Sequence, residues 1–233
     1  GKLLWKKACN HRTRPVVVDE TIHAEPWAYD LRTGEKKTRI HPITGKQSDW
    51  AWCRAGKQCG QFSASTHFLF GRSTGVGYQD LLTDQGLYTF FHSRMSCSFD
   101  SISGGGLMIK PPHAVYCRCS WSLPFTVALG QVPSSPSVGQ LFAQPGSTLP
   151  VKHLFIDFAG TGDRRDSDGN LWLKPERPLN HALVLGHEMK LEKYEGASDV
   201  RRNSRYTRID NTDTPFVFAT AIQGLKSCVV PVT

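Results

Sequence analysis

The sequence predicts an almost all-β protein made of short strands and tight turns. Among its 233 residues are 21 glycines and 14 prolines, so about one residue in seven is a turn former or a helix breaker. Apolar runs are short and end at turn residues, as where Val16–Val18 meets Asp19 and Thr21–Ala24 then alternates in polarity. Only residues 181–196 have some helical character, and they contain two glycines. We therefore expect little helix.

An order of elements that recurs along the chain suggests the blades of a β-propeller. An apolar strand, a turn, an aromatic residue, Asp-Leu and a glycine turn follow one another in residues 14–34 and again in residues 67–91. We align Gly34 of the first copy with Gly86 of the second, and with Gly1 at the end of a partial third. The intervals between these glycines bracket the length of a propeller blade. Because Gly1 then lies inside a repeat, we expect the remaining blades upstream or in another chain.

A change of composition divides the chain. Residues 131–150 are rich in Pro, Ser and Gly and have little periodicity, which is typical of a linker or a long surface loop. We therefore expect propeller-type blades over residues 1–130 and a β-rich segment over residues 151–233. No apolar run reaches the roughly 18 residues that a membrane-spanning helix needs, so we expect no membrane span.

The chain is basic, with a formal net charge of +8 at pH 7. Such a field attracts polyanions, among them acidic or sulfated polysaccharides. Lys and Arg are spread along the chain, so an ordinary solvated surface is the alternative to a dedicated binding stripe. No recognised nucleic-acid-binding module surrounds them, and we do not expect nucleic acid as the partner.

Seven cysteines occur, and five of them lie between Cys53 and Cys119. None belongs to a CxxC pair, so the signatures of zinc ribbons, thioredoxin-like proteins and c-type haem attachment are missing. The clustering favours structural disulfides, and with them a secreted, periplasmic or cell-surface location. Buried free thiols in a cytosolic protein are the alternative.

Several segments resemble a known family. Residues 22–46, IHAEPWAYDLRTGEKKTRIHPITGK, resemble the repeat of pyrroloquinoline-quinone-type (quinoprotein-like) β-propellers, with its Asp-x-x-Thr-Gly turn. Residues 56–86 and 97–129 look like the C-terminal propeller region of large exported proteins of planctomycete-type bacteria. Residues 156–173, IDFAGTGDRRDSDGNLWL, are similar to a segment that follows the propeller in that group and often precedes a β-sandwich.

The resemblance implies an all-β fold in which a partial β-propeller is followed by a small β-sandwich-like segment. It also implies disulfides among Cys59, Cys97, Cys117 and Cys119. Pyrroloquinoline quinone itself is not expected, because the quinone-dependent dehydrogenases typically carry an adjacent Cys-Cys pair over the cofactor, and this sequence has no such pair.

Closely spaced carboxylates make a candidate calcium site. Asp163, Asp166 and Asp168 precede Gly169, and a Ca²⁺ loop combines several oxygen ligands with a glycine that permits the sharp return. An EF-hand register fails, because it places an arginine at the first ligand position and a proline at the last. The alternative is a solvated turn in which neighbouring arginines neutralise the aspartates.

Catalytic candidates lie on the predicted strands near the N-terminus. His23 and Glu25 are two residues apart, so on an extended strand they share one face and could form a general acid/base pair. His41 follows Arg39 on another predicted strand. The alternative is that these are ordinary polar positions on half-exposed strands. Because no nucleophile elbow, phosphate-binding loop or dinucleotide fingerprint occurs, nothing in the sequence compels an enzyme.

Tryptophan and arginine offer a binding hypothesis. Trp50 and Trp52 stand in a polar stretch between Arg39 and Arg54, where aromatic faces and cationic donors could hold a sugar chain. The sequence thus favours a non-catalytic extracellular binding or assembly module, for an acidic polysaccharide or a partner subunit. An extracellular carbohydrate-active enzyme, a lyase or a hydrolase using His and Arg in a propeller groove, is the alternative.

Overall fold

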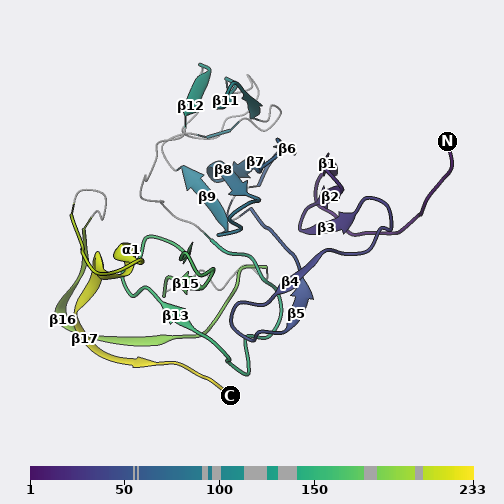
Figure 1. Cartoon of the computed structure of the whole chain (residues 1–233). Helices are drawn as coiled ribbons and strands as arrows, with labels where there is room; N and C mark the ends of the chain where they lie inside the picture. The colour runs from purple at the N-terminus through teal and green to yellow at the C-terminus, as the bar shows by residue number, and fades with distance from the viewer. Residues whose placement is uncertain are drawn as a thin grey trace.

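The structure is a computed structural model, and it describes residues 1–54, 56, 58–90, 94–95, 101–112, 125–130, 141–175, 183–202 and 207–233 (Figure 1). In these parts the chain forms strands and a single four-residue helix, which confirms the all-β prediction. The strands are grouped in six sheets of two to four strands each.

Three of these sheets are stacked. The middle sheet has four antiparallel strands in sequence order, and the two outer sheets have three each. The first outer sheet contains β1 (Val16–Val18), β2 (Thr21–Ala24) and β3 (Trp27–Asp30). The middle sheet contains β6 (Phe62–Ala64), β7 (Phe68–Ser73), β8 (Gly75–Asp80) and β9 (Leu87–Phe90). The second outer sheet contains β10 (Ile102–Gly104), β11 (Leu107–Lys110) and β12 (Val127–Gly130).

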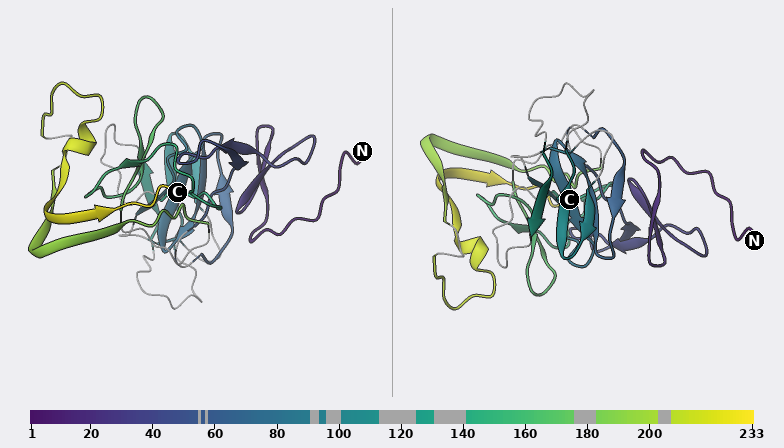
Figure 2. Two further views of the ribbon diagram at one scale, coloured as in Figure 1. Left: turned by 90° about the horizontal axis from the view of Figure 1, so that it is seen from below. Right: turned by 90° about the horizontal axis from the view of Figure 1, so that it is seen from above.

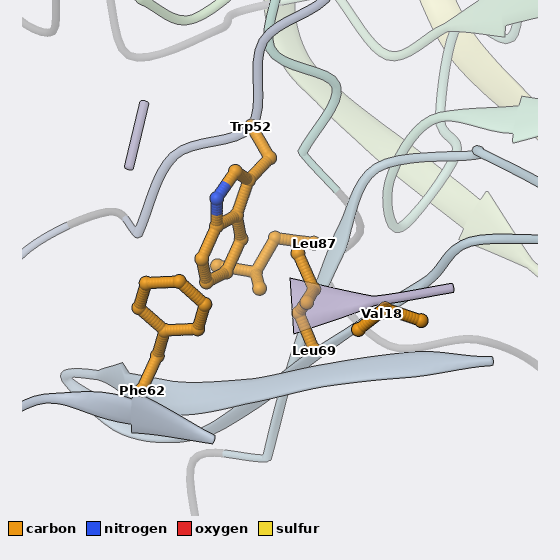
Figure 3. Packing of buried hydrophobic residues seen from close by; sticks show 5 residues of the cluster. All are labelled: Val18, Trp52, Phe62, Leu69 and Leu87. Atoms are coloured by element: carbon orange, nitrogen blue, oxygen red, sulfur yellow. The ribbon is translucent and has the colours of Figure 1, made fainter. Parts of the chain in front are cut away.

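Two apolar layers hold the three sheets together. Leu69 and Phe70 are neighbours in β7, so their side chains point to opposite faces of the middle sheet. Leu69 packs with Val18 of β1 and with Trp52 in one layer (Figure 3). Phe70 packs with Met108 of β11 in the other layer. The middle sheet is therefore buried on both faces, and each outer sheet depends on it.

The sheets of the described residues do not close into a propeller or a barrel. The partial propeller and the sandwich-like segment after it therefore stay predictions. Among the described helices, none is long and apolar enough to span a bilayer.

The recurring Asp-Leu turn is a real structural unit. In the first copy, the Asp30 carboxylate accepts hydrogen bonds from the backbone N–H groups of Arg32 and Thr33, both at 2.9 Å. Gly34 then closes the turn by donating its N–H to the Asp30 carbonyl at 2.9 Å. Its φ of 71° lies in the left-handed region, which glycine adopts without steric cost.

The second copy corrects the sequence alignment of these turns. The Asp80 carboxylate accepts the N–H groups two and three residues later, at 2.9 and 3.4 Å, and the N–H of Asp84 closes the turn on the Asp80 carbonyl at 3.0 Å. Asp84, with a φ of 44°, is thus the counterpart of Gly34, and Gly86 is not. Aspartate is one of the few residues that tolerate this conformation, so the sequence disguises the match.

The N-terminal segment packs on the first of these turns. The indole Nε1 of Trp5 donates to the carbonyl of Leu31 at 3.0 Å, and the Lys7 ammonium donates to the carbonyl of Gly34 at 3.1 Å. A β-carbon on Gly34 would lie 2.6 Å from the Trp5 ring. Glycine is therefore needed here both for its backbone conformation and for the close approach of the indole.

A second core joins the hairpin of β4 (Thr38–Ile40) and β5 (Gln47–Asp49) to a small mixed sheet of three strands, which is called the C-terminal sheet below. The C-terminal sheet has β15 (Leu171–Leu173) between β13 (Phe155–Ile156) and β14 (Arg164–Arg165). The buried residues of this core are Ile43, Phe142, Leu171, Leu173 and Leu185. Sequence-distant segments thus meet beside the β4–β5 turn.

Part of the expected linker belongs to this core. Leu87 and Leu141 exchange both backbone hydrogen bonds at 3.0 Å, and Phe142 is fully buried. Residues 131–140 lie outside the described residues, so the division at 131–150 stays a prediction.

The last two strands form a long ribbon. β16 (Lys190–Arg201) and β17 (Thr220–Val229) pair antiparallel, and the short helix α1 (Pro215–Phe218) precedes β17. Figure 2 shows this ribbon and the β1–β3 sheet at opposite ends of the molecule. Arg201 anchors the ribbon by donating from Nε to the carbonyl of Ala159 at 2.8 Å.

Candidate functional site

A cleft of about 260 Å³ opens where the β4–β5 turn meets the C-terminal sheet. One wall is the turn itself, a second is the segment just before β13, and a third comes from β14 and the loop leading to β15. The side chains that give it chemical character are His41, Lys152, His153, Phe155, Arg165 and Asn170.

The cleft is cationic. Lys152, His153 and Arg165 line it, and none of its described lining residues carries a carboxylate. Lys152 and His153 are exposed, and the carboxylates that act electrostatically on Arg165, those of Asp84 and Asp166, are not among the residues that line the cleft. Positive charge gathered in a concave, partly apolar site attracts anions more strongly than the same charge spread over a convex surface.

Arg165 is held in position by its neighbours. Its Nε donates to the carbonyl of Asp84 at 3.1 Å and one terminal nitrogen donates to the carbonyl of Gly169 at 2.7 Å. The guanidinium also lies over the Phe142 ring, 5.2 Å from its centroid. A fixed guanidinium loses little conformational freedom on binding an anion.

The β4–β5 turn, residues 41–45, has the same form as the turns at Asp30 and Asp80, with a histidine in the place of the aspartate. The Nδ1 atom of His41 accepts the backbone N–H groups of Ile43 and Thr44, at 3.1 and 3.3 Å. Gly45 donates its N–H to the His41 carbonyl at 2.9 Å and has a φ of 67°. His41, a weak catalytic candidate from the sequence, is therefore part of the backbone scaffold of the cleft.

This turn also holds the cationic wall. The carbonyl of Ile43 accepts the backbone N–H groups of Lys152 and His153, at 2.8 and 3.0 Å. The aliphatic stem of Lys152 crosses Gly45 so closely that a β-carbon there would lie 2.8 Å from its Cδ. The placement of Lys152 and His153 thus depends on the shape of residues 41–45.

Arg39, predicted to bind a ligand, instead ties the protein together. Its guanidinium donates to the Asp84 carboxylate at 2.6 Å, to Gln144 Oε1 at 2.7 Å and to the carbonyl of Ala51 at 3.0 Å. It also donates to the carbonyl of Ala143. Because its nitrogens are committed to these groups, it is not available to a ligand.

Arg54, a predicted ligand-binding residue, and Glu25, a predicted catalytic candidate, contact each other. They form a buried ion pair, with a shortest distance of 2.7 Å and side chains only 1% and 0% exposed. Arg54 also donates to the carbonyls of Gly60 and Gln61, at 3.2 and 3.4 Å. Neither side chain can reach a ligand, because the pair forms inside the fold between segments 29 residues apart.

His23 does not act with Glu25. No hydrogen bond joins the two side chains in the described structure, and the Glu25 carboxylate is taken by Arg54. His23 packs edge-on against Trp50, with ring centroids 5.5 Å apart. Burial lowers the pKa of His23 from 6.5 to about 4, so the ring is neutral near pH 7.

Neither tryptophan of the binding hypothesis is exposed as a sugar-binding face would be. Trp52 is completely buried, with the Phe62 ring against it at 5.1 Å, so it is a core residue. Trp50 is half-buried between His23 and the Arg39 guanidinium, which lies 5.7 Å from its ring centroid. The sequence around them is polar, which predicts exposure, but the chain enters the core at this point.

The aspartate loop is satisfied by its own hydrogen bonds. One Asp166 carboxylate oxygen accepts the backbone N–H groups of Asp168 and Asn170, and the other accepts the Asn170 amide and the Trp172 indole. Asp163 is buried and accepts the N–H of Phe142 at 2.7 Å. Across the described ranges, no group of three potential metal ligands is brought together.

The predicted disulfide cysteines are described only in part. Cys59 is an exposed free thiol, while Cys97, Cys117 and Cys119 lie outside the described residues. The disulfides that the resemblance implies therefore stay a prediction.

Sequence reasoning missed the three basic residues of the cleft, Lys152, His153 and Arg165. Lys152 and His153 stand in a short segment before a strand and belong to no motif. Arg165 is one of the arginines expected to neutralise the aspartates of the loop at residues 163–168, and the sequence gives no sign that it lines a cleft. Their convergence beside His41, more than a hundred residues away in sequence, is a property of the fold.

Comparison with known proteins adds no relative. The chain matches no family model, no curated protein and no solved structure. The resemblance to quinoprotein-like propellers accordingly stays a hypothesis, and the function has to be argued from the cleft.

Proposed function

We propose that this chain is a non-catalytic binding module that holds an anionic group of an acidic polysaccharide in the cleft beside the β4–β5 turn. The observation that carries the proposal is the meeting of Lys152, His153 and Arg165 without a carboxylate among the described lining residues. The like charges of Lys152 and Arg165 repel each other, and an anion bound between them relieves the repulsion. The net charge of +8 steers polyanions toward the chain.

The other lining groups suit a sugar acid. Phe155 offers an apolar face to the C–H groups of a sugar ring, and Asn170 offers an amide that can pair with hydroxyl groups. The volume of about 260 Å³ lies just below the roughly 300–1,000 Å³ of pockets that enclose whole ligands. It therefore suits one residue of a longer chain that continues outside the cleft.

The ion pair of Glu25 and the burial of His23 and His41 support binding rather than catalysis. A general acid or base must reach the proton that it transfers. Glu25 is locked in its ion pair, and His23 and His41 are both buried. An extracellular lyase or hydrolase remains the alternative, and it would have to use other groups.

A panel of acidic and neutral oligosaccharides tests the proposal. Oligogalacturonate and a sulfated oligosaccharide should bind in calorimetry, with affinity falling as salt is added, while a neutral cello-oligosaccharide should not. The same mixtures should contain no new reducing ends after prolonged incubation. Equal affinity for the neutral sugar contradicts an anion site, and cleavage of any acidic sugar favours the enzymatic alternative.

A second role, assembly with further propeller-type blades in an exported protein, is favoured by one surface. The β10–β12 sheet covers the middle sheet with one face, and its outer face carries Ile102 and Leu107, which are 63% and 42% exposed. A further β-sheet stacking there would repeat the packing on the inner face. If so, the isolated chain self-associates through this face, and Ile102→Lys reduces the association in sedimentation velocity. A monomer at all concentrations contradicts this role.

A further inference from the structure

The three copies of the repeated turn differ in the atom that holds them. In two copies a carboxylate oxygen, from Asp30 or Asp80, accepts the two backbone N–H groups. In the third copy the acceptor is Nδ1 of His41, at 3.1 and 3.3 Å from the donors. A carboxylate has lone pairs to spare, whereas a histidine nitrogen accepts with a single lone pair that a proton can occupy.

The geometry determines which tautomer of His41 is present. Because Nδ1 accepts two hydrogen bonds, it carries no proton, and the ring proton resides on Nε2. That Nε2 group is buried and has no hydrogen-bond partner among the described residues. Protonating the ring would place a hydrogen on Nδ1, facing the N–H groups of Ile43 and Thr44, and both hydrogen bonds would be lost.

The charges around His41 oppose this protonation. Arg39 is two residues before it on β4, and the positive charges of Lys152 and Arg165 stand on the other walls of the cleft, together with the imidazole of His153. The Asp84 carboxylate that serves this region is held by Arg39 and Gln79, at 2.6 and 3.0 Å. Burial first, and Arg39 second, lower the pKa of His41 below its usual 6.5. When acid does protonate the ring, no counter-ion described at the cleft compensates the new charge.

One residue, Ile43, connects the turn to Lys152 and His153 in the wall of the cleft. Ile43 donates its N–H to His41 and accepts, at its carbonyl, the N–H groups of Lys152 and His153. Its side chain is buried in the second core, so the residue cannot move without disturbing its neighbours. A turn released at His41 therefore releases the backbone that places Lys152 and His153.

These observations point to a pH-dependent positioning residue. We infer that His41 holds the anion cleft in its binding shape only while its ring is neutral, so that acidification releases a bound polysaccharide anion. The inference rests on the proposed function of the cleft. Its sign is distinctive, because electrostatics alone predicts the opposite: acid makes the chain as a whole more positive, which would tighten anion binding.

The affinity for a sulfated oligosaccharide, measured between pH 7.5 and pH 4.5, tests the inference, because sulfate keeps its charge over this range. For the native chain we expect binding to weaken about tenfold or more as the pH falls below 6.5, since two hydrogen bonds of about 1 kcal/mol each are lost. Tryptophan fluorescence at each pH verifies that the chain remains folded.

The matched variant is His41→Asn. The asparagine carbonyl oxygen accepts the same two N–H groups and does not titrate in this range, so binding should persist at pH 7.5 and no longer weaken in acid. His41→Ala, which lacks the acceptor, should bind weakly at every pH. If the native chain binds at pH 7.5 and binds more tightly in acid, or if His41→Asn weakens in acid like the native chain, the inference is wrong. Absence of binding at pH 7.5 would instead refute the proposed function.

Discussion

The buried His23 should make the stability of this protein depend on pH. Its pKa is about 4 in the folded chain and near 6.5 when the chain unfolds, because burial disfavours the imidazolium. The folded state therefore binds fewer protons than the unfolded state between these values. The contribution to stability is fully present above pH 6.5 and is lost as the pH falls toward 4.

The size of this effect follows from the two pKa values. At 1.36 kcal/mol per pKa unit, the difference corresponds to about 3 kcal/mol of unfolding free energy. His23 is 4% exposed, so solvent screens this contribution little. A loss of this size is a large fraction of the stability of a typical domain.

Urea unfolding followed by tryptophan fluorescence at pH 7, 5.5 and 4 measures the loss. The variant His23→Phe keeps a ring against Trp50 but cannot titrate, so its unfolding free energy should fall by about 3 kcal/mol less between pH 7 and pH 4. Other buried histidines, such as His41 and His187, add a common background to both proteins. If native chain and variant lose the same stability in acid, the neutral buried state assigned to His23 is wrong.

Three further outcomes follow from the same structure. Glu25→Gln leaves Arg54 buried without its counter-ion and should cost about 3–5 kcal/mol in urea unfolding; a cost below 1 kcal/mol would show that the pair is hydrated. Gly45→Ala should destabilise the chain and weaken anion binding together, because the position has a φ of 67° and its new β-carbon would meet Lys152; unchanged anion affinity would argue against the coupling of turn and cleft. Excess Ca²⁺ should leave the thermal unfolding midpoint unchanged, because the Asp166 carboxylate already accepts four hydrogen bonds, and a clear rise in the midpoint would restore the calcium site.

Local features of the fold could be predicted from the sequence. The turn at Asp30 depends on residues within five positions, and the short apolar runs predict strands because their alternation is visible without tertiary information. The sequence alignment nevertheless paired Gly34 with Gly86 in the second turn, because its true counterpart, Asp84, has a backbone conformation that glycine usually adopts. Turn chemistry was therefore predictable in kind and less so in register.

Burial could not be predicted in the same way. Trp52 and Arg54 stand in a polar stretch, yet both are fully buried, because the stacked sheets close over them and Glu25 supplies the counter-charge. The cleft is a stronger case. Lys152, His153 and Arg165 gather beside His41 only after the β4–β5 hairpin has packed on the C-terminal sheet. No local pattern encodes such a meeting.

The most direct test of the central claim is to remove one charge from the cleft and one from elsewhere. Lys152→Gln neutralises a cleft cation, and Lys2→Gln neutralises an exposed lysine in the N-terminal segment, with the same change in net charge. If the cleft binds the anion, calorimetry with a sulfated oligosaccharide at pH 7.5 should show about tenfold weaker binding for Lys152→Gln and less than about a twofold change for Lys2→Gln. Equal weakening of both variants would mean that the anion responds to the general charge of the surface, and would contradict a binding site in the cleft.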